Sequence, residues 1–224
     1  MPGTSFFTWP RPHVADFLGE AVKSICFIPF AAVKFSFDHY EEIVSQAFQE
    51  MGYRVTSIHR AGDKKKFVQD ASCIMVGGGN TFALLNRIYE YDLLGAIREK
   101  VETGTPYIGW SAGANLACPT LKTTNDMPVV MPPSFEALGL VRFQINPHYH
   151  ELRFESQGGE TRRERLEEFL VLNPTSRVIG LPEGMFIRRD GDRLMVGGAG
   201  TAKLYSLEEP VQELRAGADI SAVL

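Results

Sequence analysis

Ser111 lies at the centre of residues 109–113, GWSAG, which fit the pattern Gly-x-Ser-x-Gly. An apolar run, residues 107–110, precedes the serine and small residues follow it, so a strand that turns sharply into a helix is predicted here. At such a corner the serine side chain projects outward, and the free N–H groups of the helix start can hold a developing oxyanion. The pattern predicts a nucleophilic serine. The alternative is a glycine-flanked turn with an idle serine.

A second glycine-rich segment, residues 77–82, follows another short apolar run. It contains no lysine, so it is not a Walker loop, and Phe82 stands where a dinucleotide fingerprint needs its third glycine. A simple tight turn remains an alternative. In the functional interpretation, the N–H group of Gly78 or Gly79 lies opposite that of Ala112, and both donate to the oxyanion.

A nucleophilic serine needs a base, and His148 is the preferred candidate among the five histidines. It follows the predicted strand 141–145, which places it at the edge of the sheet where α/β proteins have their active sites. His148 and His150 could instead bind a metal ion as a pair. A catalytic zinc site needs a third ligand, and no HExxH motif or cysteine cluster accompanies the two histidines, so we expect no metal and no other cofactor.

A third group should hold the histidine in the correct tautomer. Two acids qualify: Asp126, in the segment TTNDMP (residues 123–128), and Glu183, just past the predicted buried strand 178–181. Either acid could instead be a solvated loop residue, and the residues alone leave the choice between them open.

Arg162 is a candidate for binding an anionic group. Thr161 and Glu164 have the spacing of a capping box, which predicts that a helix begins here. Arg162 shares one face of that helix with Leu166 and Leu170, so we expect it to point inward. An inward-facing arginine at a helix N-terminus favours an anion through its guanidinium and through the helix dipole. The alternative is an arginine that extends along the surface.

These candidates follow apolar segments that alternate with amphipathic ones. Strands are predicted at residues 24–30, 54–59, 73–76, 107–110, 141–145 and 178–181, helices at 37–51, 81–87, 93–103 and 162–172, and a hairpin at 186–196. Strands that alternate with helices imply a mostly parallel sheet with helices on both faces. No repeat or long linker interrupts the chain, so one domain, residues 1–224, is expected.

The composition excludes several classes of protein. Hydrophobic residues make up 44% of the 224 residues, which is typical of a globular protein rather than a disordered one. The net charge of −4 argues against nucleic acid as the main partner. The longest apolar run, residues 25–33, is too short for a membrane span of about 20 residues, and the first residues lack the pattern of a signal peptide. Three widely spaced cysteines indicate buried free thiols in a reducing cytoplasm.

In combination, the motifs resemble those of the aspartyl dipeptidases in the S51 serine peptidase family. The matching segments are FIPFA (27–31), GGGNTF (77–82), YIGWSAGANLACP (107–119), TTNDMP (123–128), INPH (145–148), GETR (159–162) and LPEG (181–184). The resemblance implies a three-layer α/β/α sandwich with a mostly parallel sheet, related to the class I glutamine amidotransferases. It also implies a cytoplasmic enzyme that hydrolyses dipeptides with N-terminal aspartate without a metal ion.

The resemblance makes Ser111 the nucleophile and His148 the base, and it offers both Asp126 and Glu183 as the third member. Glu183 is preferred as the direct partner of His148, because it ends a strand beside the predicted site. Asp126 then supports the site or binds the substrate amine. Arg162 would bind the β-carboxylate of the substrate.

Asn80, in the glycine-rich segment, is a further candidate for a substrate contact. The expected partners are small Asp-Xaa peptides, with no nucleic acid and no membrane, and the protein is expected to be a monomer or a homodimer. The opening residues 1–13 depart from the family pattern, which has a short apolar strand before them, so we expect either a sheet that lacks one strand or a sequence that is truncated at its start.

Three alternative functions remain. The closest is a cyanophycinase-like peptidase of the same fold that acts on aspartyl polymers, although short loops and the GETR segment favour the dipeptidase. A non-catalytic protein that binds aspartyl peptides is disfavoured by the complete set of serine, histidine and acid. An esterase of the α/β-hydrolase type shares Gly-x-Ser-x-Gly, but its acid and histidine usually lie much further along the chain.

Overall fold

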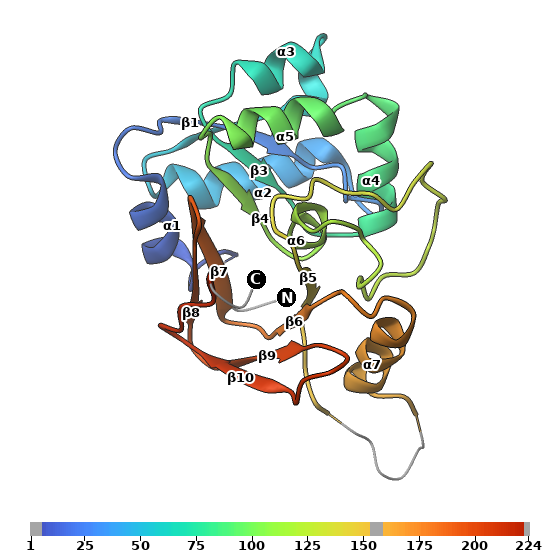
Figure 1. Ribbon diagram of the computed structural model, residues 1–224. Coiled ribbons are helices and arrows are strands. Elements are labelled where there is room, and N and C mark those ends of the chain that lie inside the picture. Colours follow the sequence, from blue (N-terminus) through green and yellow to red (C-terminus); the bar gives the residue numbers. More distant parts are fainter. Residues whose placement is uncertain (1–5, 153–158, 222–224) are drawn as a thin grey trace. The chain divides into compact units, whose positions relative to one another are not determined.

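The computed structural model describes residues 6–152 and 159–221 (Figure 1). The chain forms two compact units: unit 1 comprises residues 1–121 and 126–140, and unit 2 comprises residues 122–125 and 141–224. The expectation that residues 1–224 act as one domain stays a prediction.

The sheet of unit 1 is parallel. Its strands, in spatial order, are β2 (Arg54–Ser57), β1 (Ser24–Ile28), β3 (Ile74–Val76) and β4 (Tyr107–Gly109). In the register of the sheet, Phe27 lies between Ser57 and Met75. The central strands β1 and β3 are short runs of apolar residues, as expected for strands that are buried on both faces.

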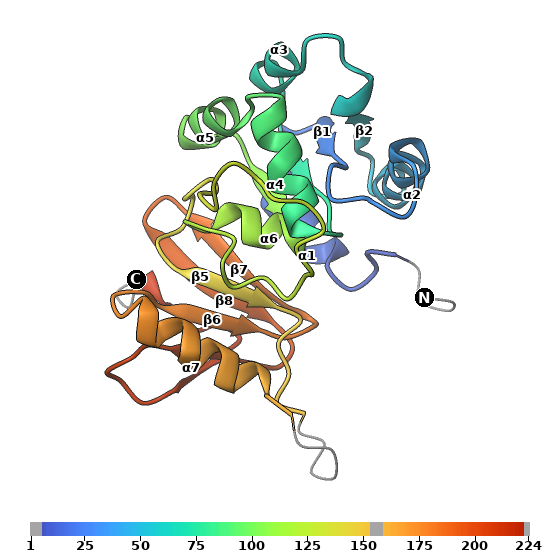
Figure 2. The same cartoon turned by 90° about the vertical axis from the view of Figure 1, so that its right-hand side faces the viewer.

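Helices cover both faces of this sheet. They are α1 (Arg11–Leu18), α2 (Phe37–Gln49), α3 (Lys64–Gln69), α4 (Thr81–Glu90), α5 (Leu94–Glu102) and α6 (Ala112–Ala117), with a short 3₁₀ helix, η1 (Ile58–Arg60), after β2. Because side chains alternate along a strand, Ile28 and Val76 pack against α3 to α6, whereas Phe27 and Met75 pack against α1 and α2. One apolar cluster lies on each face of the sheet. The sheet is thus the middle one of three layers in unit 1 (Figure 2).

Local sequence explains α2, which presents a buried face to the sheet. Its N-terminus is capped by Ser36, whose Oγ accepts a hydrogen bond from the N–H of His39 at 3.2 Å. Tyr40, Val44 and Phe48 recur at helical spacing and are buried. Capping and periodicity therefore agree on where this helix begins and which face it buries.

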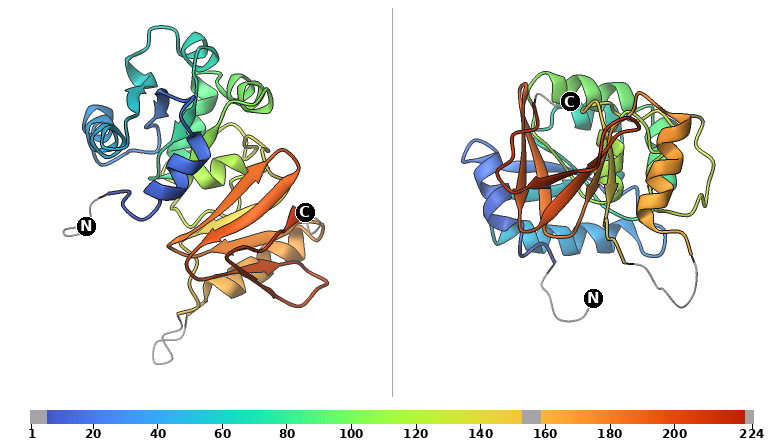
Figure 3. Two further views of the ribbon diagram at one scale, coloured as in Figure 1. Left: turned by 90° about the vertical axis from the view of Figure 1, so that its left-hand side faces the viewer. Right: turned by 60° about the horizontal axis from the view of Figure 1, so that its bottom comes forward.

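Unit 2 contains a mixed sheet. Its strands, in spatial order, are β10 (Gln212–Arg215), β9 (Thr201–Tyr205), β6 (Val178–Leu181) and β5 (Gln144–Pro147). Strands β5 and β6 are parallel, whereas β9 and β10 run antiparallel to their neighbours. Helix α7 (Arg162–Leu172) packs Leu166 and Leu170 against Val178 of β6, and strands β7 (Met185–Asp190) and β8 (Arg193–Gly198) form a hairpin (Figure 3).

The expected fold class, α/β with a mostly parallel sheet, is confirmed. Helix α7 and strand β6 have the predicted bounds, and the predicted hairpin forms. The strand expected at residues 141–145 lies instead at Gln144–Pro147. It thus reaches the residue before His148.

Some elements were missed. No helix was predicted at Arg11–Leu18, where α1 lies, or at Lys64–Gln69, where α3 lies. Asp63 caps that helix by accepting a hydrogen bond from the N–H of Lys66 at 2.9 Å. Strands β9 and β10 were also missed, because each alternates polar and apolar residues only briefly and depends on its neighbour in the sheet.

The three cysteines, Cys26, Cys73 and Cys118, are free and buried, as predicted. Within residues 6–152 and 159–221, no helix combines the length and the apolar character that crossing a bilayer requires.

Candidate active site

Ser111 occupies the corner between β4 and α6. Its backbone angles are φ 54° and ψ −112°, a conformation that residues with a Cβ rarely adopt. Such a conformation costs on the order of 1–3 kcal/mol and persists only where the surroundings impose it. A strained serine that joins a strand to a helix is the arrangement that exposes a nucleophilic hydroxyl.

The flanking glycines are needed because backbone lies where a side chain would be. A Cβ atom on Gly109 would lie under 3.0 Å from the carbonyl oxygen of Gly113, and one on Gly113 would lie equally close to the carbonyl oxygen of Val76. Tyr107, on β4, donates a hydrogen bond from its hydroxyl to the Gly113 carbonyl at 2.7 Å. The strand and helix are thus pressed together on both sides of Ser111.

The loop of residues 77–79 lies against the serine. A Cβ atom on Gly78 would lie 3.0 Å from the Cβ of Ser111. The loop is held at its ends, where Gly77 donates its N–H to Ile28 and Asn80 donates its N–H to Ala31. Gly79 has φ 137°, a backbone conformation that glycine tolerates.

Three backbone N–H groups of this region are available for an oxyanion. Within the described part of the chain, the N–H groups of Gly78 and Gly79 donate to no backbone carbonyl. Ala112 is the first residue of α6, so its N–H has no acceptor inside the helix. Since Gly78 and Ala112 both adjoin Ser111, the arrangement can stabilise negative charge that develops beside the serine hydroxyl.

Asp126 and Asn80 join another loop to the start of α4. The Oδ2 atom of Asp126 accepts hydrogen bonds from the N–H of Thr81 at 2.7 Å and from its Oγ1 at 2.5 Å. The side-chain oxygen of Asn80 caps α4 by accepting from the N–H of Ala83 at 3.0 Å, and its Nδ2 donates to the carbonyl of Met127 at 2.8 Å. The structure therefore gives both candidates an anchoring contact next to the glycine loop.

His148 and Glu183 are in contact in unit 2. His148 follows the last residue of β5 and Glu183 lies two residues past the end of β6, so both stand at the carboxyl edge of two parallel neighbours. The Nδ1 atom of His148 is hydrogen-bonded to Oε1 of Glu183. Their side chains are 49% and 76% exposed, so the pair is open to solvent and substrate. His148 also has a positive φ, 56°.

The segment before Asp126 supports the strand that carries His148. Thr123 donates its hydroxyl to the Ile145 carbonyl at 2.9 Å, and Asn125 donates its Nδ2 to the Pro147 carbonyl at 2.7 Å. Asn146 returns two bonds, from its Nδ2 to the Thr123 carbonyl and to the Asn125 amide oxygen. The motif TTNDMP predicted a role for Asp126 alone, and the roles of Asn125 and Thr123 were not predicted.

Arg162 is the first residue of α7, and one nitrogen of its side chain is buried without a hydrogen-bond partner among the described residues. Both bonds of the predicted capping box between Thr161 and Glu164 are present. The buried nitrogen is the Nε atom of Arg162. Burial lowers the pKa of the Arg162 guanidinium, and the positive charge of Arg165 lowers it further. A buried guanidinium nitrogen without a hydrogen-bond partner favours a ligand that can accept a bond from it, such as a carboxylate.

The candidates divide between the two units. Unit 1 holds Ser111, Ala112, Gly78, Gly79, Asn80 and Asp126, and unit 2 holds His148, Glu183 and Arg162. Within unit 1, Ser111 lies beside the glycine loop, and Asn80 and Asp126 both hold the start of α4. Within unit 2, His148 meets Glu183. Asp126 instead binds Thr81.

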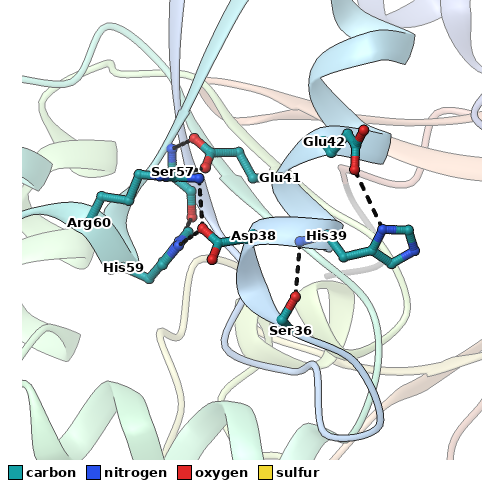
Figure 4. Close-up of polar contacts among 8 residues, drawn as sticks. All are labelled: Ser36, Asp38, His39, Glu41, Glu42, Ser57, His59 and Arg60. Atoms are coloured by element: carbon teal, nitrogen blue, oxygen red, sulfur yellow. Dashed lines mark hydrogen bonds and ion pairs between the residues drawn. The ribbon is translucent and has the colours of Figure 1, made fainter.

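One group of side chains in the described ranges has the composition of a metal site: Asp38, Glu41 and His59, with ligand atoms within 4.8 Å of one another (Figure 4). Both ring nitrogens of His59 are engaged, Nε2 with Asp38 at 3.0 Å and Nδ1 with Ser57 Oγ at 2.6 Å. Arg60 forms ion pairs with both carboxylates. Because every member already has a partner and the guanidinium supplies the positive charge, this group is an ion-pair network that joins α2 to η1.

The chain is similar to known proteins over most of its length. The model of a family described as Peptidase family S51 matches residues 3–197. A protein named Peptidase E from Nostoc sp. is 47% identical over 211 residues, which are 94% of this chain and 87% of that protein. Peptidase E of Actinobacillus pleuropneumoniae serotype 5b is 47% identical over 197 residues, covering 88% of this chain and 84% of that protein.

A solved structure also resembles this chain. The crystal structure of a peptidase from an acI-B1 Actinobacterium superposes with a TM-score of 0.69 at 22% identity, covering 95% of this chain and 89% of that one. At this identity the likeness bears on the fold.

Proposed function

The chain belongs to peptidase family S51, and from that premise we propose that it is a serine-type dipeptidase that hydrolyses Asp-Xaa dipeptides through an acyl-enzyme at Ser111. The observation that carries the proposal is the corner at Ser111, where a strained serine lies beside backbone N–H groups without backbone partners. Strain of this kind clusters at functional sites, because it costs stability and is not expected to persist without a role in function.

In the proposed reaction, Ser111 Oγ attacks the carbonyl carbon of the substrate's aspartyl residue while His148 accepts the serine proton. The N–H groups of Ala112 and of Gly78 or Gly79 hold the negative charge that develops on the carbonyl oxygen. The C–N bond breaks when His148 returns the proton to the leaving amine, and an ester remains on Ser111. Water, deprotonated by His148, then attacks the ester and releases aspartate.

Glu183 is the group we propose to orient the base. Its carboxylate accepts a hydrogen bond from Nδ1 of His148, which leaves Nε2 to accept the proton of the serine. The same negative charge stabilises the imidazolium that forms during the reaction. Asp126 is already bound to the N–H and hydroxyl of Thr81, so we propose that it supports the loop of residues 77–79 from the start of α4.

Arg162 is the group we propose to select aspartate. Its buried, unpartnered Nε lies at the first turn of α7, where the helix dipole also favours negative charge. A bidentate pair with the β-carboxylate would satisfy it. Asparagine lacks that charge, and glutamate is longer by one methylene, which would displace the scissile carbonyl from the serine. A displacement of about 1 Å can cost on the order of 10²-fold in rate.

The test is the release of free aspartate from Asp-Leu in the presence of a chelator, with Asn-Leu, Glu-Leu, Leu-Leu and an aspartyl polymer as comparisons. We expect hydrolysis of Asp-Leu, and we expect Arg162→Met to lower kcat/KM for Asp-Leu by about 30-fold or more, since a lost buried charge pair costs at least about 2 kcal/mol. The rates on the first three dipeptides should then converge.

Arg165→Met is the matched control. Arg165 lies on the same helix, is 60% exposed and pairs with Glu160, so its loss should leave the preference for Asp-Leu intact. If Arg162→Met keeps that preference, the anion site lies elsewhere. Hydrolysis of the polymer in place of Asp-Leu would support the cyanophycinase-like alternative.

A further inference from the structure

The backbone of His148 has a conformation that few residues other than glycine adopt. Its φ of 56° lies in the left-handed region, which is uncommon for residues with a Cβ, although histidine enters it more often than most. The hydrogen bond between Nδ1 and Glu183 fixes the ring only if the backbone beneath it is fixed as well. The structure must therefore hold the residues on either side of His148.

The two neighbours of His148 are both attached to β6. Pro147 pairs with Leu181 in the parallel ladder, and its carbonyl accepts a hydrogen bond from Asn125. Tyr149 donates its N–H to the carbonyl of the same Leu181 at 3.1 Å. The main chain is thus attached to β6 at Pro147 and again at Tyr149, and His148 lies between these two attachments. Residues 147–149 are called the arch below.

The side chain of Tyr149 holds the C-terminal end of the arch in place. The residue is 5% exposed, and its ring covers Gly180, where a Cβ atom would lie 2.7 Å from the ring. Its hydroxyl is hydrogen-bonded to the hydroxyl of Tyr205 on β9, a residue that is 1% exposed. Tyr149 also donates to Glu151 at 3.3 Å. Tyr205 comes from a strand that belongs to the same sheet, next to β6.

We infer that the hydroxyl pair of Tyr149 and Tyr205 is a positioning device for the catalytic base: it fixes the backbone of His148 and thereby the direction of its imidazole. The inference rests on the proposed function, in which His148 transfers the proton, but it concerns residues that the proposal does not use. Tyr149 is a positioning residue, because its side chain is buried beneath the arch and acts only through its neighbour.

Removing either hydroxyl breaks the same bond from opposite ends. Tyr149→Phe and Tyr205→Phe keep both rings, so the packing on Gly180 is preserved while the link to β9 is lost. We expect each variant to lower kcat for Asp-Leu by about 10-fold with little change in KM, since a small misplacement of a catalytic group acts on the chemical step. The double variant should be no slower than Tyr149→Phe, because Tyr205→Phe removes only the bond that Tyr149→Phe has already broken.

The matched control is Tyr53→Phe, which also removes a hydroxyl from a residue that is 7% exposed, in this case one bonded to the Gly19 carbonyl in unit 1. We expect its kcat to equal that of the wild type. All rates are measured well below the unfolding midpoint of each variant, so that a loss of folded protein does not imitate a loss of kcat.

A second readout does not depend on activity. With ¹³Cε1-labelled histidine, the NMR signal of His148, assigned by its absence in His148→Gln, should shift or broaden in Tyr149→Phe and Tyr205→Phe but not in Tyr53→Phe. An unchanged signal would overturn the inference, as would an equal loss of kcat in the control. If the wild type fails to hydrolyse Asp-Leu while the signal responds as expected, the proposed substrate is wrong and the positioning device stands.

Discussion

Ser111 and His148 share an unusual property, a positive backbone φ close to 55° at a residue that is not glycine. Each stands at the carboxyl end of a strand in its own unit, Ser111 after β4 and His148 after β5. In both places hydrogen bonds or close backbone packing on the adjacent residues impose the conformation. The strained conformation of Ser111 supports its proposed role in the reaction independently of its chemistry.

The strain at Ser111 predicts that replacing this residue with glycine lowers activity as much as alanine does but leaves a more stable protein. Ser111→Ala and Ser111→Gly should both lower kcat by at least about 10³-fold. Only the glycine variant removes the Cβ that opposes φ 54° and ψ −112°, so it should unfold at a higher temperature than the alanine variant. Circular dichroism during heating, together with the Asp-Leu assay, checks this. A glycine variant that melts below the alanine variant would show that the corner is not strained.

The two acids should separate by what their loss changes. Glu183 is 76% exposed and bonds to His148, so Glu183→Gln should lower kcat by about 10²–10⁴-fold and leave the unfolding temperature unchanged. Asp126 receives two bonds from Thr81, so Asp126→Asn should lower the unfolding temperature and reduce kcat less. Steady-state kinetics and melting curves for both variants decide the matter, and the reverse pattern would make Asp126 the orienting acid.

At the scale of the element, the strand β4 and helix α6 are arranged by what their glycines permit. Gly109 and Gly113 bring backbone to backbone on both sides of the corner, so the Gly-x-Ser-x-Gly pattern is a packing requirement as much as a turn requirement. The central strand β3 takes part through the carbonyl of Val76. Ser111, the proposed nucleophile, is therefore positioned by the parallel sheet itself.

Gly113→Ala should force β3 and α6 apart, because its Cβ would lie under 3.0 Å from the Val76 carbonyl. We expect a loss of about 1–3 kcal/mol of unfolding free energy, as for other overpacked sites, together with a large loss of kcat. Gly95→Ala is the control: Gly95 is the second residue of α5 and has open space where its Cβ would be, so alanine should not lower the free energy of unfolding there. Urea titrations measure both, and equal changes of one sign would contradict the packing argument.

Across the whole molecule, buried cysteine and tyrosine side chains with raised pKa values limit the stability of the fold at high pH. Burial raises the pKa of Cys26 and of Tyr40 to about 12, and burial followed by the charge of Cys26 raises the pKa of Cys73 to about 12. These groups hold their protons in the folded protein at pH values where the unfolded chain loses them. They stabilise the fold fully below about pH 9, near the pKa of a thiol in the unfolded chain, and the contribution falls as the pH rises toward 12.

The unfolding temperature, measured with reductant from pH 8 to pH 11, should therefore fall steadily above pH 9. Tyr40→Phe removes one of these groups, so its curve should fall less steeply between pH 10 and pH 11 than that of the wild type, whatever the offset caused by the lost bond to Gly78. Tyr91→Phe, at a residue that is 43% exposed, should keep the wild-type slope. Identical slopes for all three proteins would show that Tyr40 is not the titrating group.

Features that depend on neighbours along the chain could be predicted from the amino-acid sequence. The capping box at Thr161 and Glu164 predicted the first residue of α7, and an apolar run predicted β6 with its bounds. The Gly-x-Ser-x-Gly pattern located the corner at Ser111 for the same reason. Each signal lies within a few residues, and local hydrogen bonds and sterics suffice to produce the structure.

Features that depend on which strands are neighbours could be identified only in the folded chain. The parallel pairing of β5 with β6 brings His148 to Glu183, 35 residues further along the chain. The antiparallel return of β9 brings Tyr205 to Tyr149 across 56 residues. The position of Glu183 past a predicted strand favoured it as the partner of His148, but only the pairing of β5 with β6 brings the two side chains together, and no local pattern predicted the contact between the two tyrosines. Strand order is set by the burial of apolar surface over a whole unit, and the polar contacts at the sheet edge follow from that order.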